Sequence, residues 1–202
     1  MARNIEPIVK RCRALGISPA TMGYTGVSKR DSIRDPGAQK RKKKSEYALQ
    51  LNEKQKVKFI YGVLERQFHT YYEKAARMTG KTGDNLLKIL ESRLDNVVFN
   101  LGFAMTRPEA RQLVRHGHFT VNGKKVNIPS YLCRAGDVIA VKETSRSSEK
   151  FKAIMEANAA NPIPKWLDVD RAAQSGRIIN LPEREEIDLP IEEHLIVELY
   201  SK

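Results

Sequence analysis

The sequence predicts an α+β fold: a basic N-terminal arm, a set of helices and a small α/β module of helix, turn and antiparallel strands. Three observations lead to this prediction. Apolar residues recur at helical spacing through much of residues 45–116. Short alternating runs then flank an Asn-Gly pair within residues 119–141, which is typical of an antiparallel hairpin. Residues 1–44 instead mix cations with glycine and proline and show no apolar periodicity.

The charge of the chain favours a polyanionic partner. The 202 residues include 36 Lys and Arg against 24 Asp and Glu, which gives a net charge of +12 and a pI near 9.7. The net charge is +9 in residues 1–45, +3 in 46–90, +3 in 91–141 and −3 in 142–202. We therefore expect the first three blocks to face nucleic acid, and the acidic end to face protein or solvent.

Composition also excludes several classes of protein. Cys12 and Cys133 are far apart and neither belongs to a Cys-x-x-Cys pair, so we expect no disulfide framework, no metal site and no cofactor. The four histidines show no metal spacing, and no catalytic arrangement stands out, so the chain is predicted not to be an enzyme and to have no small-molecule substrate. Without a secretion signal or a membrane-spanning run, we expect a soluble, cytoplasmic protein without membrane contact.

The first 44 residues are predicted to form an arm that binds RNA. They end in an unbroken cationic run, Lys40 to Lys44, and cannot bury enough apolar surface to fold alone. An arm that orders against a polyanion is the use we favour over a disordered solubilising tail. Its candidate RNA contacts are Arg3, Arg11, Arg13, Lys40, Arg41, Lys43 and Lys44.

A helical pattern begins at Ser45, a good N-cap, with Tyr47, Leu51 and Ala48 predicted on one side of the first helix. A second stripe keeps the spacing of a buried helix face, so its aromatic residues are expected in the core rather than stacked on RNA. That stripe consists of Val57, Ile60, Tyr61, Leu64, Phe68 and Tyr71. The cations around these helices are candidates for phosphate contact on their chemistry alone: Lys54, Lys56, Lys58 and Arg66.

Residues 80–83 (GKTG) superficially resemble the end of a nucleotide-binding loop. The required earlier glycine is Ala75, and a helix rather than a strand precedes it, so we reject that function and predict a loop. Helices are then expected over residues 84–91 and 94–101.

The central stretch sets a basic helix against a basic hairpin. Thr106 and Glu109 have the spacing of a capping box, which predicts a helix to about His116. Arg107, Arg111 and Arg115 recur every four residues, so we expect them to share one cationic face.

Gly117 suits the end of that helix, and residues 119–121 alternate as a strand does. Asn122-Gly123 is a strong hairpin signal, so Lys124 and Lys125 should return toward the C-terminal end of the helix. This surface suits the phosphates of structured RNA. The alternative is an ordinary solvated helix face, and His116 and Asn122 are weaker candidates because both have structural reasons to be there.

Later segments carry weaker patterns. A further strand is predicted at residues 137–141, a helix over 145–161 that Pro162 breaks, and a short extended piece at 166–169. Residues 191–200 fit a last helix or a strand. No internal repeat is evident.

Several blocks in order resemble the universal family of ribosomal protein S-four of the small subunit, over nearly the whole length. They are residues 53–57 (EKQKV), 61–68 (YGVLERQF), 94–98 (LDNVV), 109–114 (EARQLV), 121–123 (VNG), 129–131 (PSY), 136–137 (GD) and 193–201 (EHLIVELYS). The resemblance implies an arm (1–44), a helical domain (45–93, completed by 170–202) and an inserted RNA-binding module (94–169). It also makes the last segment a helix.

The resemblance further implies a non-catalytic constituent of the small ribosomal subunit. Members bind a junction in the 5′ domain of 16S rRNA early in assembly, contact the fifth small-subunit protein, and place the end of the arm, here Lys40 to Lys44, where messenger RNA enters. The resemblance also implies a role in translational accuracy, because the end of the arm lies at the messenger RNA entry site. Some relatives bind zinc through four N-terminal cysteines, but this region has only Cys12, so zinc is not expected.

Two other functions remain as alternatives. The same small module is appended to RNA-modifying and aminoacylating enzymes, but no further catalytic domain is evident here. A free RNA-binding stress factor is disfavoured by the full-length helical frame. We also expect the acidic residues 183–188 to meet a protein neighbour.

Overall fold

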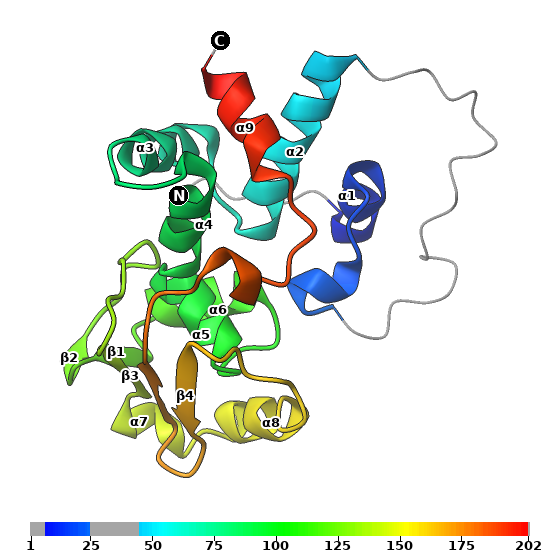
Figure 1. Ribbon diagram of the computed structural model, residues 1–202. Coiled ribbons are helices and arrows are strands. Elements are labelled where there is room, and N and C mark those ends of the chain that lie inside the picture. Colours follow the sequence, from blue (N-terminus) through cyan, green and yellow to red (C-terminus); the bar gives the residue numbers. More distant parts are fainter. Residues whose placement is uncertain (1–6, 25–44, 202) are drawn as a thin grey trace. The chain divides into compact units, whose positions relative to one another are not determined.

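The structure is a computed structural model that describes residues 7–24 and 45–201 (Figure 1). The chain divides into two compact units. The helical unit runs up to Asn85 and resumes at Leu189, and the sheet unit is Leu86–Asp188. The boundaries expected from the sequence, at 45–93, 94–169 and 170–202, stay predictions. The α+β class is confirmed, because helices accompany one five-stranded antiparallel sheet.

The helical unit is built from helices whose ends have clear causes. The Ser45 hydroxyl accepts a hydrogen bond from the Ala48 amide at 3.3 Å and caps the second helix, as predicted. Gly62 at φ 61° lies between that helix and the next, in a conformation that favours glycine. The elements are α1 (Ile8–Leu15), a 3-10 helix (Pro19–Met22), α2 (Glu46–Ile60), α3 (Glu65–Ala76), the first part of α4 (Thr82–Glu91) and α9 (Glu193–Tyr200).

The side of α2 that carries Tyr47, Ala48 and Leu51 is not its buried face. Tyr47 is 58% exposed and Leu51 is half-buried, whereas Gln50, Glu53 and Val57 are buried. Polar partners explain the difference, because the Gln50 side-chain amide donates to a Glu198 carboxylate oxygen of α9 at 3.0 Å. The predicted apolar stripe from Val57 to Tyr71 is buried except at Leu64, but it is divided between α2 and α3.

Part of the arm has structure of its own. Residues 7–24 form α1 and the 3-10 helix, and α1 packs against α2. Cys12, Leu15, Ile17 and Met22 are all buried in the full chain, where α1 has α2 as a neighbour, so the expectation that the arm cannot fold on its own stays a prediction. Residues 25–44, with their cationic run, lie outside the described residues.

The C-terminal segment is a helix, as the resemblance implied. Figure 1 shows α9 lying beside α2, and the two helices pack against each other. At its end, the Tyr200 ring lies 4.6 Å from the Tyr72 ring of α3, centroid to centroid. The Tyr200 hydroxyl donates to a Glu65 carboxylate oxygen at 2.8 Å. The last helix is therefore fixed to both α2 and α3.

The sheet unit places helices on a sheet with the strand order β2-β1-β3-β5-β4. Every pairing between neighbouring strands is antiparallel. Its helices are the end of α4, α5 (Leu94–Asn100), α6 (Arg107–Arg115), α7 (Glu143–Arg146), α8 (Glu149–Ala157) and a 3-10 helix (Arg184–Glu186). Its strands are β1 (Phe119–Val121), β2 (Lys124–Lys125), β3 (Val138–Val141), β4 (Leu167–Asp170) and β5 (Ser175–Ile178).

The core of the sheet unit joins α5, α6 and α8 to the sheet. Phe119 of β1 lies 6.2 Å from Phe103 and 6.1 Å from Phe151 between ring centroids, and all three are buried. Gly176 of β5 lets α5 approach the sheet, because a Cβ there would overlap the Leu101 side chain and lie 3.2 Å from the Asp168 carbonyl oxygen.

Two parts of this unit differ from the prediction. The helix expected over residues 145–161 is two helices, α7 and α8, because the chain turns at Ser147 and Ser148. Strand β5 was not predicted. Its sequence, Ser175–Ile178, has only one large apolar residue, and its pairing with β3 and β4 depends on contacts distant in sequence.

Candidate nucleic-acid interface

Helix α6 begins close to where the sequence placed it. The Thr106 hydroxyl accepts from the Glu109 amide at 3.3 Å, as a capping box requires. The other half of the box is displaced by one residue, because the Glu109 carboxylate accepts from the Met105 amide at 3.0 Å rather than from that of Thr106. Both contacts fix the direction of the helix.

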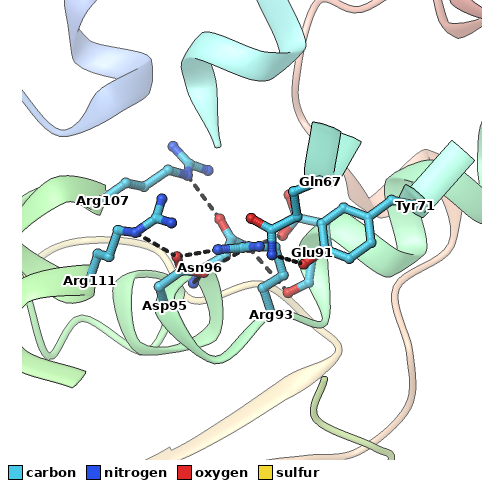
Figure 2. A network of polar contacts seen from close by, with 8 residues as sticks. All are labelled: Gln67, Tyr71, Glu91, Arg93, Asp95, Asn96, Arg107 and Arg111. Carbon is cyan, nitrogen blue, oxygen red and sulfur yellow. Dashed lines mark hydrogen bonds and ion pairs between the residues drawn. The ribbon is translucent and has the colours of Figure 1, made fainter. Parts of the chain in front are cut away.

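A buried polar network joins the end of α4 and the start of α5 to α6 (Figure 2). Arg93 is fully buried, and its Nη2 and Nε donate to the Asp95 carboxylate at 2.6 and 3.0 Å. Asn96 donates from its side-chain amide to a Glu91 carboxylate oxygen at 2.6 Å. Each of these four side chains has a partner, which a buried network needs in order to be stable.

Two of the three predicted RNA-contacting arginines of α6 point into this network. Arg107 is 9% exposed, its Nε donates to Asn96 Oδ1 at 2.8 Å, and its guanidinium lies 4.4 Å over the Phe99 ring. The Arg111 side chain is 20% exposed, with Nε 4.0 Å from Asp95 Oδ2. The expectation of one exposed cationic face is therefore wrong, because α5 packs against that side of α6.

The C-terminal end of α6 is open to solvent. Arg115 and His116 are exposed, and Gly117 at φ 76° ends the helix as predicted. A Cβ at Gly117 would lie 3.0 Å from the Lys125 ammonium nitrogen and overlap its side chain, so glycine leaves room for that lysine. The predicted approach of the hairpin to the helix end is confirmed for Lys125.

The hairpin has the predicted turn. Asn122 and Gly123 have φ of 50° and 77°, and Val121 pairs with Lys124 across it. The Asn122 side-chain amide donates to Asp137 at 2.8 Å, and its oxygen accepts from the Val138 amide at 2.9 Å. Asn122 therefore holds the hairpin against β3, and whether it also contacts RNA stays a prediction.

Lys124 and Lys125 are exposed on β2, the edge strand of the sheet. Within the part of the chain that the structure describes, neither ammonium forms an ion pair. Positive charge at this edge thus stays available to an anion from outside.

Further cations come from segments that the sequence analysis did not select. The Lys142 amide donates to the His118 carbonyl at 2.8 Å, just beyond the pairing of Phe119 with Val141. Lys150 of α8 pairs with Glu109 at 3.1 Å. Lys142 could have been selected from the sequence, because it directly follows the strand predicted at residues 137–141. No feature of the sequence indicated Lys150.

His118 lies among these cations. Its Nδ1 is 2.9 Å from the Ser145 hydroxyl, and its ring meets Phe151 edge to face at 5.6 Å. Burial, and then the positive charges of His116, Lys150, Lys125 and Lys142, lower the pKa of His118 below its usual 6.5. The basic edge, as we call the C-terminal end of α6 with these neighbours, consists of Arg115, His116, His118, Lys124, Lys125, Lys142 and Lys150.

The predicted lysines of α2 have carboxylate partners instead. Lys54 and Lys58 both reach Glu65, at 2.9 and 2.6 Å, and Lys56 pairs with Glu53. Burial alone would raise the pKa of Glu65, but hydrogen bonds from Lys58, Lys54 and Tyr200 outweigh it and lower the pKa to about 2. These ammonium groups are already paired within the helical unit, and their RNA contact stays a prediction.

The remaining predicted contacts are distributed along the chain. Arg13 and Arg66 are exposed, and Arg11 is half-buried on α1. Arg3, Lys40, Arg41, Lys43 and Lys44 lie outside the described residues.

Other kinds of site find no support in the described residues. Over 7–24 and 45–201, no three His, Cys, Asp or Glu side chains gather as metal ligands would. Cys12 and Cys133 are both buried thiols, and burial raises the pKa of each. No helix in the same ranges is long and apolar enough to cross a membrane.

Comparison with known proteins gives two matches that together cover most of the chain. Residues 3–91 match the family described as ribosomal protein S4/S9 N-terminal domain, and residues 92–139 match the S4 domain. The chain is 55% identical to small ribosomal subunit protein uS4 of Agathobacter rectalis and 58% identical to that of Acetivibrio thermocellus. Each alignment spans 100% of both chains.

Proposed function

This chain belongs to the family of small ribosomal subunit protein uS4, and we propose that it is a primary binding protein of 16S rRNA. In this proposal it binds a multi-helix junction of the 5′ domain without help from other proteins and nucleates assembly of that domain. As a family member it is a structural, RNA-binding constituent of the small ribosomal subunit and not an enzyme. It is located in the ribosome, in the cytoplasm.

The observation that carries the proposal is the basic edge. Lys124 and Lys125 project from a hairpin that Asn122 fixes to the sheet, and Arg115 and His116 are exposed beside them. Ammonium and guanidinium groups on a rigid frame suit closely spaced phosphates, which dominate recognition of folded RNA. Neutralising those phosphates releases counterions and would stabilise the packing of helices that otherwise repel each other.

Two further contacts belong to the same proposal. The end of the arm, Lys40 to Lys44, would lie where messenger RNA enters, and through that place the protein would contribute to translational accuracy. The acidic residues 183–188 would meet a protein neighbour, which the family resemblance identifies as the fifth small-subunit protein. Four of these side chains, Glu183, Glu185, Glu186 and Asp188, are exposed, which supports an external partner.

Direct binding to the isolated 5′ domain of 16S rRNA tests primary binding. The full-length chain should saturate this RNA with no other protein present, with an affinity that falls steeply as salt rises. A complex that forms only after other small-subunit proteins are added would contradict primary binding. Competition with an equal mass of transfer RNA is the control for nonspecific attraction by the net charge.

The protein contacts need separate tests. Crosslinking within assembled subunits should join residues 183–188 to the fifth small-subunit protein, and crosslinks from this segment to RNA alone would reject that part. Crosslinking to a bound messenger should involve the segment Lys40 to Lys44.

A further inference from the structure

His118 lies on the basic edge but differs from its neighbours, because its ring is half-buried and held in place. Ser145 lies at Nδ1, and Phe151 supports one side of the ring. The backbone is fixed as well, since its carbonyl accepts from the Lys142 amide and its amide donates to the Leu113 carbonyl. Among the described residues, Nε2 has no hydrogen-bond partner.

The charges around this imidazole come from four elements of the sheet unit. His116 follows α6, with its ring 6.2 Å from that of His118, Lys125 lies on β2, Lys142 precedes α7, and Lys150 lies on α8. Lys150 is paired with the Glu109 carboxylate of α6. Burial and all four of these neighbours oppose a positive charge on His118, so they lower the pKa of the ring and favour its neutral form in the free protein.

We propose that His118, Lys125 and Lys142 bind one backbone phosphate of RNA, and that the His118 ring takes up a proton from solvent as that phosphate arrives. This inference rests on the proposed RNA-binding function. A phosphate beside the ring introduces the opposite charge that favours the imidazolium, in which both ring nitrogens carry a proton, so that Nε2–H can donate to a phosphate oxygen. Nδ1 stays with Ser145.

The direction of the pH dependence follows from this proton uptake. Well above the pKa of the bound state, the ring is neutral in both states, and pH has no effect through it. Between the free and bound pKa values, the complex holds one more proton, so affinity rises as pH falls. Below the pKa of His118 in the free protein, the ring is protonated both in the free protein and in the complex, and affinity no longer changes with pH through this ring.

Binding of the full-length chain to the 5′ domain RNA, measured from about pH 5.5 to about pH 8 at constant ionic strength, tests the inference. The wild-type dissociation constant should fall on acidification by at most about tenfold per pH unit. The His118→Gln variant should lose most of this dependence, so the ratio of its dissociation constant to that of wild type should grow as pH falls. His194→Gln, an exposed histidine in the helical unit, is the matched control and should keep the wild-type dependence.

Nuclear magnetic resonance of the histidine rings gives a second test that needs no variant. The pKa of His118 should be higher in the RNA complex than in the free protein. An unchanged pKa of His118, or equal pH dependence in wild type and His118→Gln, would overturn the inference while leaving RNA binding intact. Failure of the wild type to bind RNA at any pH would instead overturn the proposed function.

Discussion

The two ends of α6 carry arginines at the same four-residue spacing but use them differently. At the N-terminal end, Arg107 is buried between Asn96 and Phe99, and Arg111 lies near Asp95. At the C-terminal end, Arg115 is exposed beside the lysines of the hairpin. One end therefore holds α5 to α6, and the other presents charge to solvent. Spacing decides which residues share a face, but the packing of neighbouring helices decides whether that face reaches solvent.

The largest expected effect is at the buried end. Asp95→Ala would leave the fully buried Arg93 without its carboxylate, at a cost of about 3–5 kcal/mol in the free energy of unfolding. Urea denaturation measures this loss. Glu156→Ala, an exposed carboxylate on α8, is the control and should stay within about 0.5 kcal/mol of wild type. A loss of similar size in both variants would show that the effect does not come from the buried ion pair of Arg93 with Asp95.

Removing an arginine from one end of α6 should affect stability, and removing one from the other end should affect the salt dependence of RNA binding. Arg107→Ala should lower the free energy of unfolding by about 1.5–3 kcal/mol, because it removes a charged hydrogen bond, and should leave the salt dependence of RNA binding unchanged. Arg115→Ala should leave stability within about 0.5 kcal/mol but reduce the slope of log K against log salt by about 1. A reduced slope for Arg107→Ala would show that the buried end also contacts RNA.

The exposed lysines of β2 and the paired lysines of α2 allow a similar comparison. Lys124→Ala combined with Lys125→Ala should reduce the salt slope by about 2, because in the proposed contact each of the two lysines would neutralise one phosphate. Lys54→Ala combined with Lys58→Ala is the matched control, and its slope should equal that of wild type because Glu65 already pairs with both ammonium groups. Filter binding over a salt series measures both, and equal slopes for the two double variants would contradict the account.

The smallest expected effect is a loss of stability at low pH. Because the pKa of Glu65 is about 2 in the folded protein against an ordinary 4.5, its contribution to stability is present above about pH 4.5 and is lost as pH falls toward 2. The loss should stay below about 1 kcal/mol, since the carboxylate is half exposed. Urea midpoints at about pH 7 and about pH 3 should differ less in Glu65→Gln than in wild type, and an equal difference would argue against the depressed pKa.

Local chemistry was predictable from the sequence. Thr106, Gly117 and Asn122-Gly123 each impose a backbone conformation through their own side chains or lack of one, so the helix start, the helix end and the hairpin turn are where the sequence placed them. The family resemblance and the last helix were predictable for a different reason, because ordered blocks of residues identify a shared fold.

Features that depend on tertiary packing were not predictable in the same way. The burial of Arg107 needs α5 against α6, strand β5 needs its partners β3 and β4, and the pairing of Lys58 with Glu65 needs the bend between α2 and α3. Lys150 reaches the basic edge only because α8 packs on the sheet unit. Each involves residues whose proximity the periodicity of a single element does not encode.

The reactivity of the lysine amines with and without RNA tests the central claim most directly. Acetylation of the full-length chain, followed by mass spectrometry, should show that the 5′ domain RNA protects Lys124, Lys125 and Lys142, whereas Lys54, Lys56 and Lys58 react equally in both states. Protection of the α2 lysines together with unchanged reactivity of Lys124 and Lys125 would contradict the account.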